Sequence, residues 1–194
     1  MGAVSTIGLV GLTGCGAQRA SDTGSSAGEG GIADTITFAQ GADPRGLDPA
    51  YVDDGESAKV MCNIYDTVLR YDAESTEVLP CLGEMPEISD DGLTYTFKIR
   101  EGVKFHDGTD CDADAIVTSI TRQLEPNRTA DMPYASFVFG SEETNNGIAS
   151  IEAPDATTLV ITLRAPSTPF IKNMAMALAA PIVAPSAIDA GDSN

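Results

Sequence analysis

Positive charge is scarce in this sequence. Its 194 residues include 11 Lys and Arg against 29 Asp and Glu, which gives a net charge of -18 at pH 7. Binding to nucleic acid or to an anionic lipid surface depends on clustered Lys and Arg, so the composition argues against both as partners. An acidic surface would suit cationic ligands, but it also keeps a protein soluble, and solubility alone explains it.

Residues typical of catalytic and metal centres are also few. There is one histidine, His106, and none of the four cysteines stands in a C-x-x-C pair, so neither a zinc site nor a redox pair is indicated. The sequence has no glycine-rich phosphate loop and no nucleophile elbow. The acidic run Asp110–Asp114 begins like an EF-hand loop, but Ala115 and Thr121 stand where that loop needs Gly and Glu. We expect no cofactor and no catalysis.

Long apolar runs are missing as well. The run Ala3–Leu12 is too short to span a bilayer as a permanent helix, and it ends in Leu-Thr-Gly-Cys15, which resembles the lipobox of bacterial lipoproteins. An ordinary signal peptide or a buried segment is the alternative. No Lys or Arg precedes the run, so we expect the natural start to lie upstream. Gly16–Ile32 is rich in Gly, Ser and Ala, which predicts a flexible tether.

The most informative stretch is Glu87–Thr109. Residues 93–100 alternate between apolar and polar side chains, which predicts a strand with one buried face. Asp90-Asp91-Gly92 supplies a turn before that strand, and Asp107-Gly108 supplies another after a second short strand that begins at Val103. The residues alone therefore predict a small antiparallel meander.

Within that stretch, the run SDDGLTYTFKIREGVKFHDGT resembles the signature of the family 5 extracellular solute-binding proteins, the peptide and nickel receptors of ABC importers. The similarity continues through LDPAY (47–51), NIYDTVLRYD (63–72), residues 133–140 and IEAPDATTLVITLRAP (151–166). It covers residues 35–189 in all. The resemblance implies an α+β chain with a partial type II periplasmic-binding-protein fold and no enzymatic activity.

The resemblance also implies a domain organisation. It assigns residues 1–15 to a lipoprotein signal peptide, 16–33 to a flexible linker, 34–60 to the start of lobe one, 61–180 to most of lobe two, and 181–194 to a return toward lobe one. We expect a further lobe, with most of the charged residues that hold ligand, to be encoded downstream.

Hydrophobic periodicity predicts the remaining elements. We expect a strand at 34–39, an amphipathic core helix at 57–71, a helix from Ala113 to Leu124 capped by Asp110 or Asp112, a hairpin of 148–153 with 157–163, a helix at 170–180, and an extended return after Pro181.

Ligand contacts are implied by the resemblance alone. In peptide-binding relatives a Tyr in a Pro-Tyr-Ala-Ser context approaches the ligand, which makes Tyr134 the first candidate here; core packing is the alternative. Phe137 and Phe139 are predicted to be core residues. In the family, the loop before Leu-Asp-Pro also runs beside the ligand, although an ordinary solvated loop is the other interpretation. By position this loop contributes Gly41, Ala42, Asp43, Arg45 and Gly46.

The cysteines allow one disulfide. If Cys15 is lipidated, three cysteines remain, and Cys81 with Cys111 is the pair we favour because both flank the meander. His106 lies at a turn of the family pattern and is predicted to be structural.

The function implied by the resemblance is solute capture outside the cytoplasm. A lipid-anchored receptor would bind a small peptide or related solute between its lobes and deliver it to ABC permease subunits, touching the membrane only through its anchor. A nickel or metal-chelate receptor of the same family is the main alternative. Two alternative functions lie outside transport: an exported hydrolase and a structural surface lipoprotein without a ligand.

Overall fold

The computed structural model describes residues 37–191. The predicted signal peptide, Cys15, the tether and half of the strand expected at 34–39 lie outside these residues. Thr37–Ala39, the described half of that strand, form no strand. The described residues from Ala39 to Gly191 belong to one compact unit.

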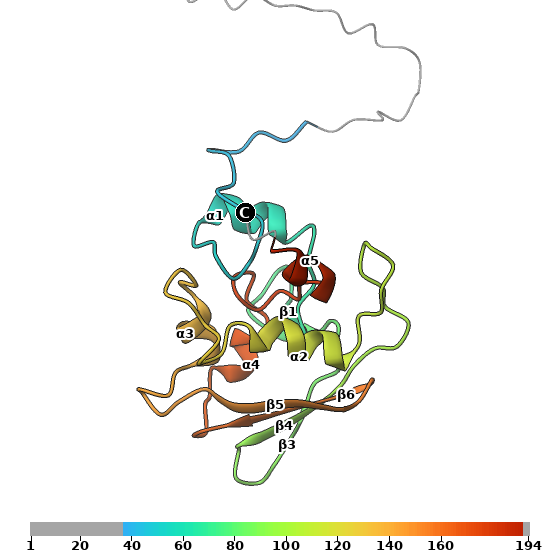
Figure 1. Ribbon diagram of the computed structural model, residues 1–194, viewed down its shortest axis with the longest axis vertical. Helices are drawn as coiled ribbons and strands as arrows, with labels where there is room; N and C mark the ends of the chain where they lie inside the picture. The colour runs from blue at the N-terminus through green and yellow to red at the C-terminus, as the bar shows by residue number, and fades with distance from the viewer. Residues whose placement is uncertain (1–36, 192–194) are drawn as a thin grey trace, which may run out of the picture. The chain divides into compact units, whose positions relative to one another are not determined.

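A four-stranded antiparallel sheet is the main element of the described chain, with the order β3-β4-β6-β5 (Figure 1). Its strands are β3 Glu87–Ile88, β4 Thr94–Lys98, β5 Ile148–Asp155 and β6 Thr158–Leu163. The predicted hairpin of β5 and β6 is confirmed. The predicted strand at Val103 is wrong: β3 and β6 occupy both edges of β4, so residues 103–105 find no strand partner there and make one isolated bridge, between Lys104 and Asp110.

One face of the sheet carries the core. Tyr95 and Phe97 of β4 are 5% and 0% exposed, as the alternation predicts, and Leu159 and Ile161 of β6 are buried beside them. Burying side chains of this size contributes about 1.5–3 kcal/mol each. Figure 1 shows helix α2, Ala113–Thr121, lying across this sheet, and it contacts β5 and β6.

The sequence of α2 explains both its start and its orientation. Of the two predicted caps, Asp112 is the one used: its carboxylate accepts a hydrogen bond from the Ala115 amide at 3.0 Å. Ile116 and Ile120, one turn apart, are buried against the sheet. The helix therefore meets the core with the face that its periodicity predicts.

The predicted helix at 57–71 is mostly wrong. Helix α1 spans only Gly55–Met61, and Asn63 ends it by donating its side-chain amide to the Lys59 carbonyl at 2.7 Å. Leu69–Tyr71 instead forms strand β1, which pairs with β2, Val78–Pro80. The Leu69 amide also donates to the distant Met174 carbonyl at 3.4 Å, so partners outside the segment replace the hydrogen bonds that a longer helix would have made internally.

The end of the described chain departs from prediction in the same way. Helix α4 covers only Phe170–Asn173, and Ala179 has a left-handed φ of 63°. Ala179 is held by tertiary bonds, because its amide donates to the Pro49 carbonyl at 2.9 Å and its carbonyl accepts from Gln123 Nε2 at 2.8 Å. The expected extended return contains a short helix, α5, at Pro185–Ala190.

Candidate functional site

The LDPAY segment is anchored by a buried ion pair. Arg122, at the C-terminal end of α2, donates from both terminal nitrogens to the Asp48 carboxylate at 2.8 and 2.6 Å. The two side chains are 14% and 7% exposed. Asp48 also accepts from the Ala50 amide at 3.0 Å. This bidentate contact fixes the segment to α2.

A small apolar cluster joins the LDPAY segment, which follows the candidate loop, to the chain around Tyr134. Ala50, which follows Asp48, is buried together with Met132 and Ala135, and Tyr51 packs against the same group. Met132 and Ala135 flank Tyr134 in the chain. The structure therefore brings Ala50 of the LDPAY segment into contact with Met132 and Ala135, one on each side of Tyr134 in sequence.

The candidate loop before LDPAY is exposed, with one pinned residue. The Arg45 amide donates to Ser57 Oγ at 2.9 Å, and its guanidinium donates to Asp53 at 3.1 Å. Gly41, Ala42, Asp43 and Arg45 are all exposed, whereas Gly46 is half-buried. The loop thus presents both charged side chains to solvent, while the backbone amide of Arg45 ties it to α1.

The cap at the start of α1 orients the Ser57 hydroxyl so that its oxygen can accept the hydrogen bond from the Arg45 amide. Asp54 caps the helix, accepting from the Ser57 amide at 2.8 Å and from the Ser57 hydroxyl at 2.7 Å. The hydroxyl bond is the main cause of a lowered pKa at Asp54. Ser57 therefore donates to the cap and accepts from Arg45 with the same oxygen.

Tyr134 is half-buried and precedes the short helix α3, Ala135–Phe139. Its ring packs against the core and meets Phe137 edge-on, with 6.3 Å between ring centroids. Phe139 is 1% exposed, as predicted, but Phe137 is 65% exposed, so the prediction of a core position for it is wrong. Residues two apart lie on nearly opposite sides of a helix, and α3 has only one side against the core.

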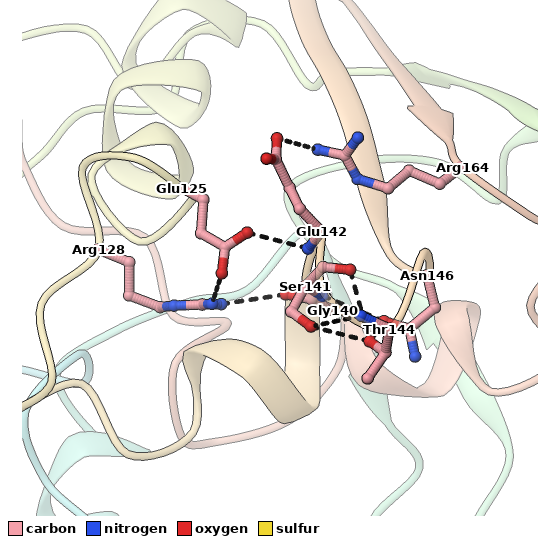
Figure 2. Close-up of polar contacts among 8 residues, drawn as sticks. All are labelled: Glu125, Arg128, Gly140, Ser141, Glu142, Thr144, Asn146 and Arg164. Atoms are coloured by element: carbon pink, nitrogen blue, oxygen red, sulfur yellow. Dashed lines mark hydrogen bonds and ion pairs between the residues drawn. The ribbon is translucent and has the colours of Figure 1, made fainter.

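A polar cluster, which we call the Arg128 clasp, joins the chain before α3 to the chain after it (Figure 2). It consists of Glu125, Arg128, Gly140 and Glu142. Arg128 donates to the Gly140 carbonyl at 3.0 Å and forms an ion pair with Glu125. The second carboxylate oxygen of Glu125 accepts from the Glu142 amide at 2.9 Å. No local sequence pattern pairs the chain before α3 with the chain after it, so these residues could not be predicted from the sequence.

A hollow of about 580 Å³ opens beside the anchor. Asp48, Tyr51, Arg122 and Met132 contribute to its wall. Among the described residues that line it, neither Tyr134 nor the loop 41–46 appears. The hollow therefore adjoins the anchor of the candidate site and is distinct from the two predicted ligand-facing segments.

A second hollow, of about 280 Å³, contains His106 and Cys111 in its wall. Ser186 of α5 donates a hydrogen bond to Asp107 at its edge, and this bond, with those from Thr109, lowers the pKa of Asp107 to about 2. Within residues 37–191, no group of three His, Cys, Asp or Glu side chains could hold a metal ion.

The cysteines are free thiols in the described chain, so the predicted Cys81–Cys111 disulfide is not formed there. The Cys81 thiol is directed to the carboxylate of Asp66, with 3.6 Å between sulfur and oxygen. Burial, followed by the nearby charges of Asp112 and Asp66, raises the pKa of Cys111 to about 11.

None of the helices in the described part of the chain has the length and apolar composition of a membrane span.

The arrangement of sheet and helices in the described residues is that of part of a periplasmic binding protein. The family model described as "Bacterial extracellular solute-binding proteins, family 5 Middle" matches residues 77–194. The chain therefore belongs to the family 5 extracellular solute-binding proteins, which are transport receptors and not enzymes.

Several relatives carry names that describe a bound solute. Heme-binding protein A of Haemophilus influenzae is 33% identical over 73% of this chain and 28% of its own length. The dipeptide-binding protein of Escherichia coli is 31% identical over 74% of this chain and 29% of its own length. A glutathione-binding protein of the same species is 35% identical over 81% and 28%.

Solved structures agree in fold. A periplasmic binding protein of Helicobacter pylori in complex with the peptide STSA aligns with a TM-score of 0.67 and 33% identity, covering 77% of this chain and 31% of that one. NikA of Brucella suis in complex with Fe(III)-EDTA aligns with a TM-score of 0.63 and 27% identity over 77% and 28%. The chain thus spans less than a third of the length of these relatives.

Proposed function

We propose that the protein containing this chain is the solute receptor of an ABC importer and that its solute is a small peptide. Family membership is the observation that carries this proposal. Two relatives named above support a peptide as the solute: the dipeptide-binding protein and the Helicobacter pylori protein in complex with STSA. Both are at least 31% identical to this chain.

Tyr134 and the candidate loop 41–46 would contact the peptide in different ways. The half-buried Tyr134 can keep its ring in the core while its hydroxyl bonds the peptide backbone. In the loop, Asp43 and Arg45 offer exposed charges, and Gly41 and Gly46 leave the main chain accessible to an extended ligand. Ala42 completes this loop.

The mechanism is non-covalent enclosure. Hinge closure of the lobes buries the peptide, and the closed receptor delivers it to the permease subunits. We further propose that Cys15 carries a lipid anchor and that the receptor works outside the cytoplasm beside its permease. Residues 34–60 and 61–180 would then belong to lobes one and two.

A metal chelate is the second candidate solute. It is favoured by the similarity to NikA in complex with Fe(III)-EDTA and by the relative named for heme binding. Among the described residues, no group of three His, Cys, Asp or Glu side chains could hold a metal ion directly.

Thermal unfolding of the complete gene product tests the proposal. We would measure it alone and with a mixed di- and tripeptide library, glutathione, nickel or haem. A ligand present at 100 times its Kd stabilises the folded state by about 2.7 kcal/mol, so peptide should raise the midpoint clearly. A well-folded protein that responds to none of the peptides would overturn the peptide assignment, and a response only to nickel or haem would replace it with the second candidate.

A further inference from the structure

Helix α3 is too short to be stable by itself. It has five residues, Ala135–Phe139, and its N-cap, Tyr134, makes no side-chain cap hydrogen bond. Helices this short are unstable in isolation because nucleation costs more than so few hydrogen bonds return. Contacts from elsewhere in the chain must therefore hold Tyr134 and the turn that follows it.

The Arg128 clasp supplies such contacts from both sides of α3 (Figure 2). Arg128 precedes the helix, and the carbonyl that accepts its 3.0 Å hydrogen bond belongs to Gly140, the C-cap. Glu125 bridges the same two segments, because one carboxylate oxygen pairs with Arg128 and the other accepts from the Glu142 amide at 2.9 Å. Together these bonds close the chain around α3.

The ion pair of the clasp is less exposed to solvent than an ordinary surface ion pair. The Arg128 side chain is 11% exposed and that of Glu125 is 31% exposed. Charge-assisted hydrogen bonds in such surroundings are stronger than exposed ones, since water competes less. The neighbouring pair of Arg164 with Glu142 lies farther out, with Glu142 61% exposed.

The segment after α3 is tied to the sheet. The Arg164 amide, just beyond β6, donates to the Gly147 carbonyl at 2.9 Å. Gly147 lies directly against the end of α3. A Cβ on Gly147 would lie 2.0 Å from the Phe139 carbonyl oxygen and 2.4 Å from Gly140 Cα. Through Gly140, the clasp therefore connects α3 to a rigid part of the molecule.

We propose that Glu125 and Arg128 are positioning residues for ligand binding: they act through α3 to hold Tyr134 where its hydroxyl meets the solute. This inference rests on the proposed function. The two residues touch no solute themselves. Their role is to fix the helix whose first turn begins at Tyr134, whose carbonyl accepts from the Val138 amide at 2.9 Å.

Hydrogen exchange tests the positioning step without any ligand. Arg128→Met removes both of the guanidinium's bonds while keeping an apolar stem of similar length. Amides of residues 134–140 should exchange several-fold faster in this variant. The control is Lys104→Met, which removes the exposed ion pair with Asp110 and should leave residues 134–140 unchanged. Unchanged exchange in Arg128→Met would overturn the inference.

A double-mutant cycle in the complete gene product tests the link to binding. The probe is an equimolar di- and tripeptide library, and the readout is its half-saturating concentration at a temperature where circular dichroism shows every variant folded. Arg128→Met should raise that concentration about tenfold in the wild-type background and less than twofold in a Tyr134→Phe background. Arg128→Lys, which keeps the charge but has one donor nitrogen in place of the two that Arg128 uses, should fall between Arg128→Met and wild type.

Each other outcome has a distinct meaning. If the two substitutions weaken binding independently, so that their effects multiply, Arg128 does not act through Tyr134 and the inference fails. If Tyr134→Phe changes nothing while the wild type binds peptide, the inference fails and the proposed function stands. If the folded wild type binds no peptide, the proposed function fails and the inference falls with it.

Discussion

The ion pair between Asp48 and Arg122 shows how single residues fix the candidate site. Its partners lie 74 positions apart in sequence, and it holds the LDPAY segment on α2. Arg122 Nε has no hydrogen-bond partner among the described residues although it is buried. One buried N–H group of Arg122 is therefore left without an acceptor. Losing either residue of the pair would leave the other residue's charge buried without a counter-ion.

The first prediction concerns that charge. Arg122→Met should destabilise the chain by about 3–5 kcal/mol, because it strands the Asp48 carboxylate in a buried position. Arg45→Met is the matched control: it removes the exposed contact with Asp53 and should cost only about 0–1 kcal/mol. Urea denaturation of the two variants gives the comparison. Equal losses would show that the Asp48 anchor contributes no more than a surface pair.

The second prediction concerns the thiols. Cys62 is exposed, whereas Cys111 is buried and its pKa is raised to about 11. The thiolate is the reactive form, so iodoacetamide at pH 8 should label Cys62 and leave Cys111 almost unmodified in the native protein. Peptide mass spectrometry after brief labelling reads this out. Rapid labelling of Cys111 without denaturant would contradict its burial.

At the scale of elements, the turn Asp107–Thr109 is joined to α5 although the two are far apart in sequence. Asp107 accepts from the hydroxyl of Ser186, and also from the Thr109 hydroxyl at 2.6 Å and its amide at 2.9 Å. All three bonds favour the ionised carboxylate. The turn of the family signature thus serves as an attachment point for the last described helix.

The third prediction follows from these bonds. Because the pKa of Asp107 in the folded state is lowered from 3.8 to about 2, the stability that it contributes is fully present above pH 3.8 and is lost as the pH falls through about 2. An NMR titration should place its midpoint near 2 in the wild type. Ser186→Ala removes the largest cause and should raise that midpoint toward 3.8. An unchanged midpoint would argue against the contact with α5.

The fourth prediction compares two glycines with similar backbone angles. Gly147 has φ 80° and Gly102 has φ 74°, but a Cβ on Gly102 meets nothing within 4 Å, whereas one on Gly147 lies 2.0 Å from the Phe139 carbonyl oxygen. Gly102→Ala should cost about 1–2 kcal/mol for the left-handed backbone alone. Gly147→Ala should cost clearly more, because the loop must open. Similar denaturation midpoints for both variants would contradict the close approach.

These elements also show what sequence could predict. The strand β4, the helix α2 and the hairpin of β5 and β6 were predicted correctly because their own side chains set the periodicity. The predicted helices at 57–71 and 170–180 were too long because their backbones bond to distant parts of the chain: the Leu69 amide donates to the Met174 carbonyl, and the Ala179 amide donates to the Pro49 carbonyl. Local pattern cannot reveal such partners.

At the scale of the whole molecule, the fold joins the LDPAY segment, which follows the candidate loop, to the chain around Tyr134. The cluster of Ala50, Met132 and Ala135 brings the end of the Leu-Asp-Pro segment to the neighbours of Tyr134. Resemblance pointed to Tyr134 and the loop, but neither the Asp48 anchor nor the Arg128 clasp could be predicted, since both depend on tertiary contacts. The site role of Tyr134 and of the loop stays a prediction.

The fifth prediction is the binding event itself. We expect the complete gene product to bind di- or tripeptides saturably, with one peptide per molecule, and to bind them more weakly after Tyr134→Phe. Isothermal titration calorimetry with peptides of defined sequence measures both the stoichiometry and the Kd. Saturable one-to-one binding would support the peptide-receptor account. A folded protein that binds no peptide, whether it takes a metal chelate instead or nothing at all, would contradict it.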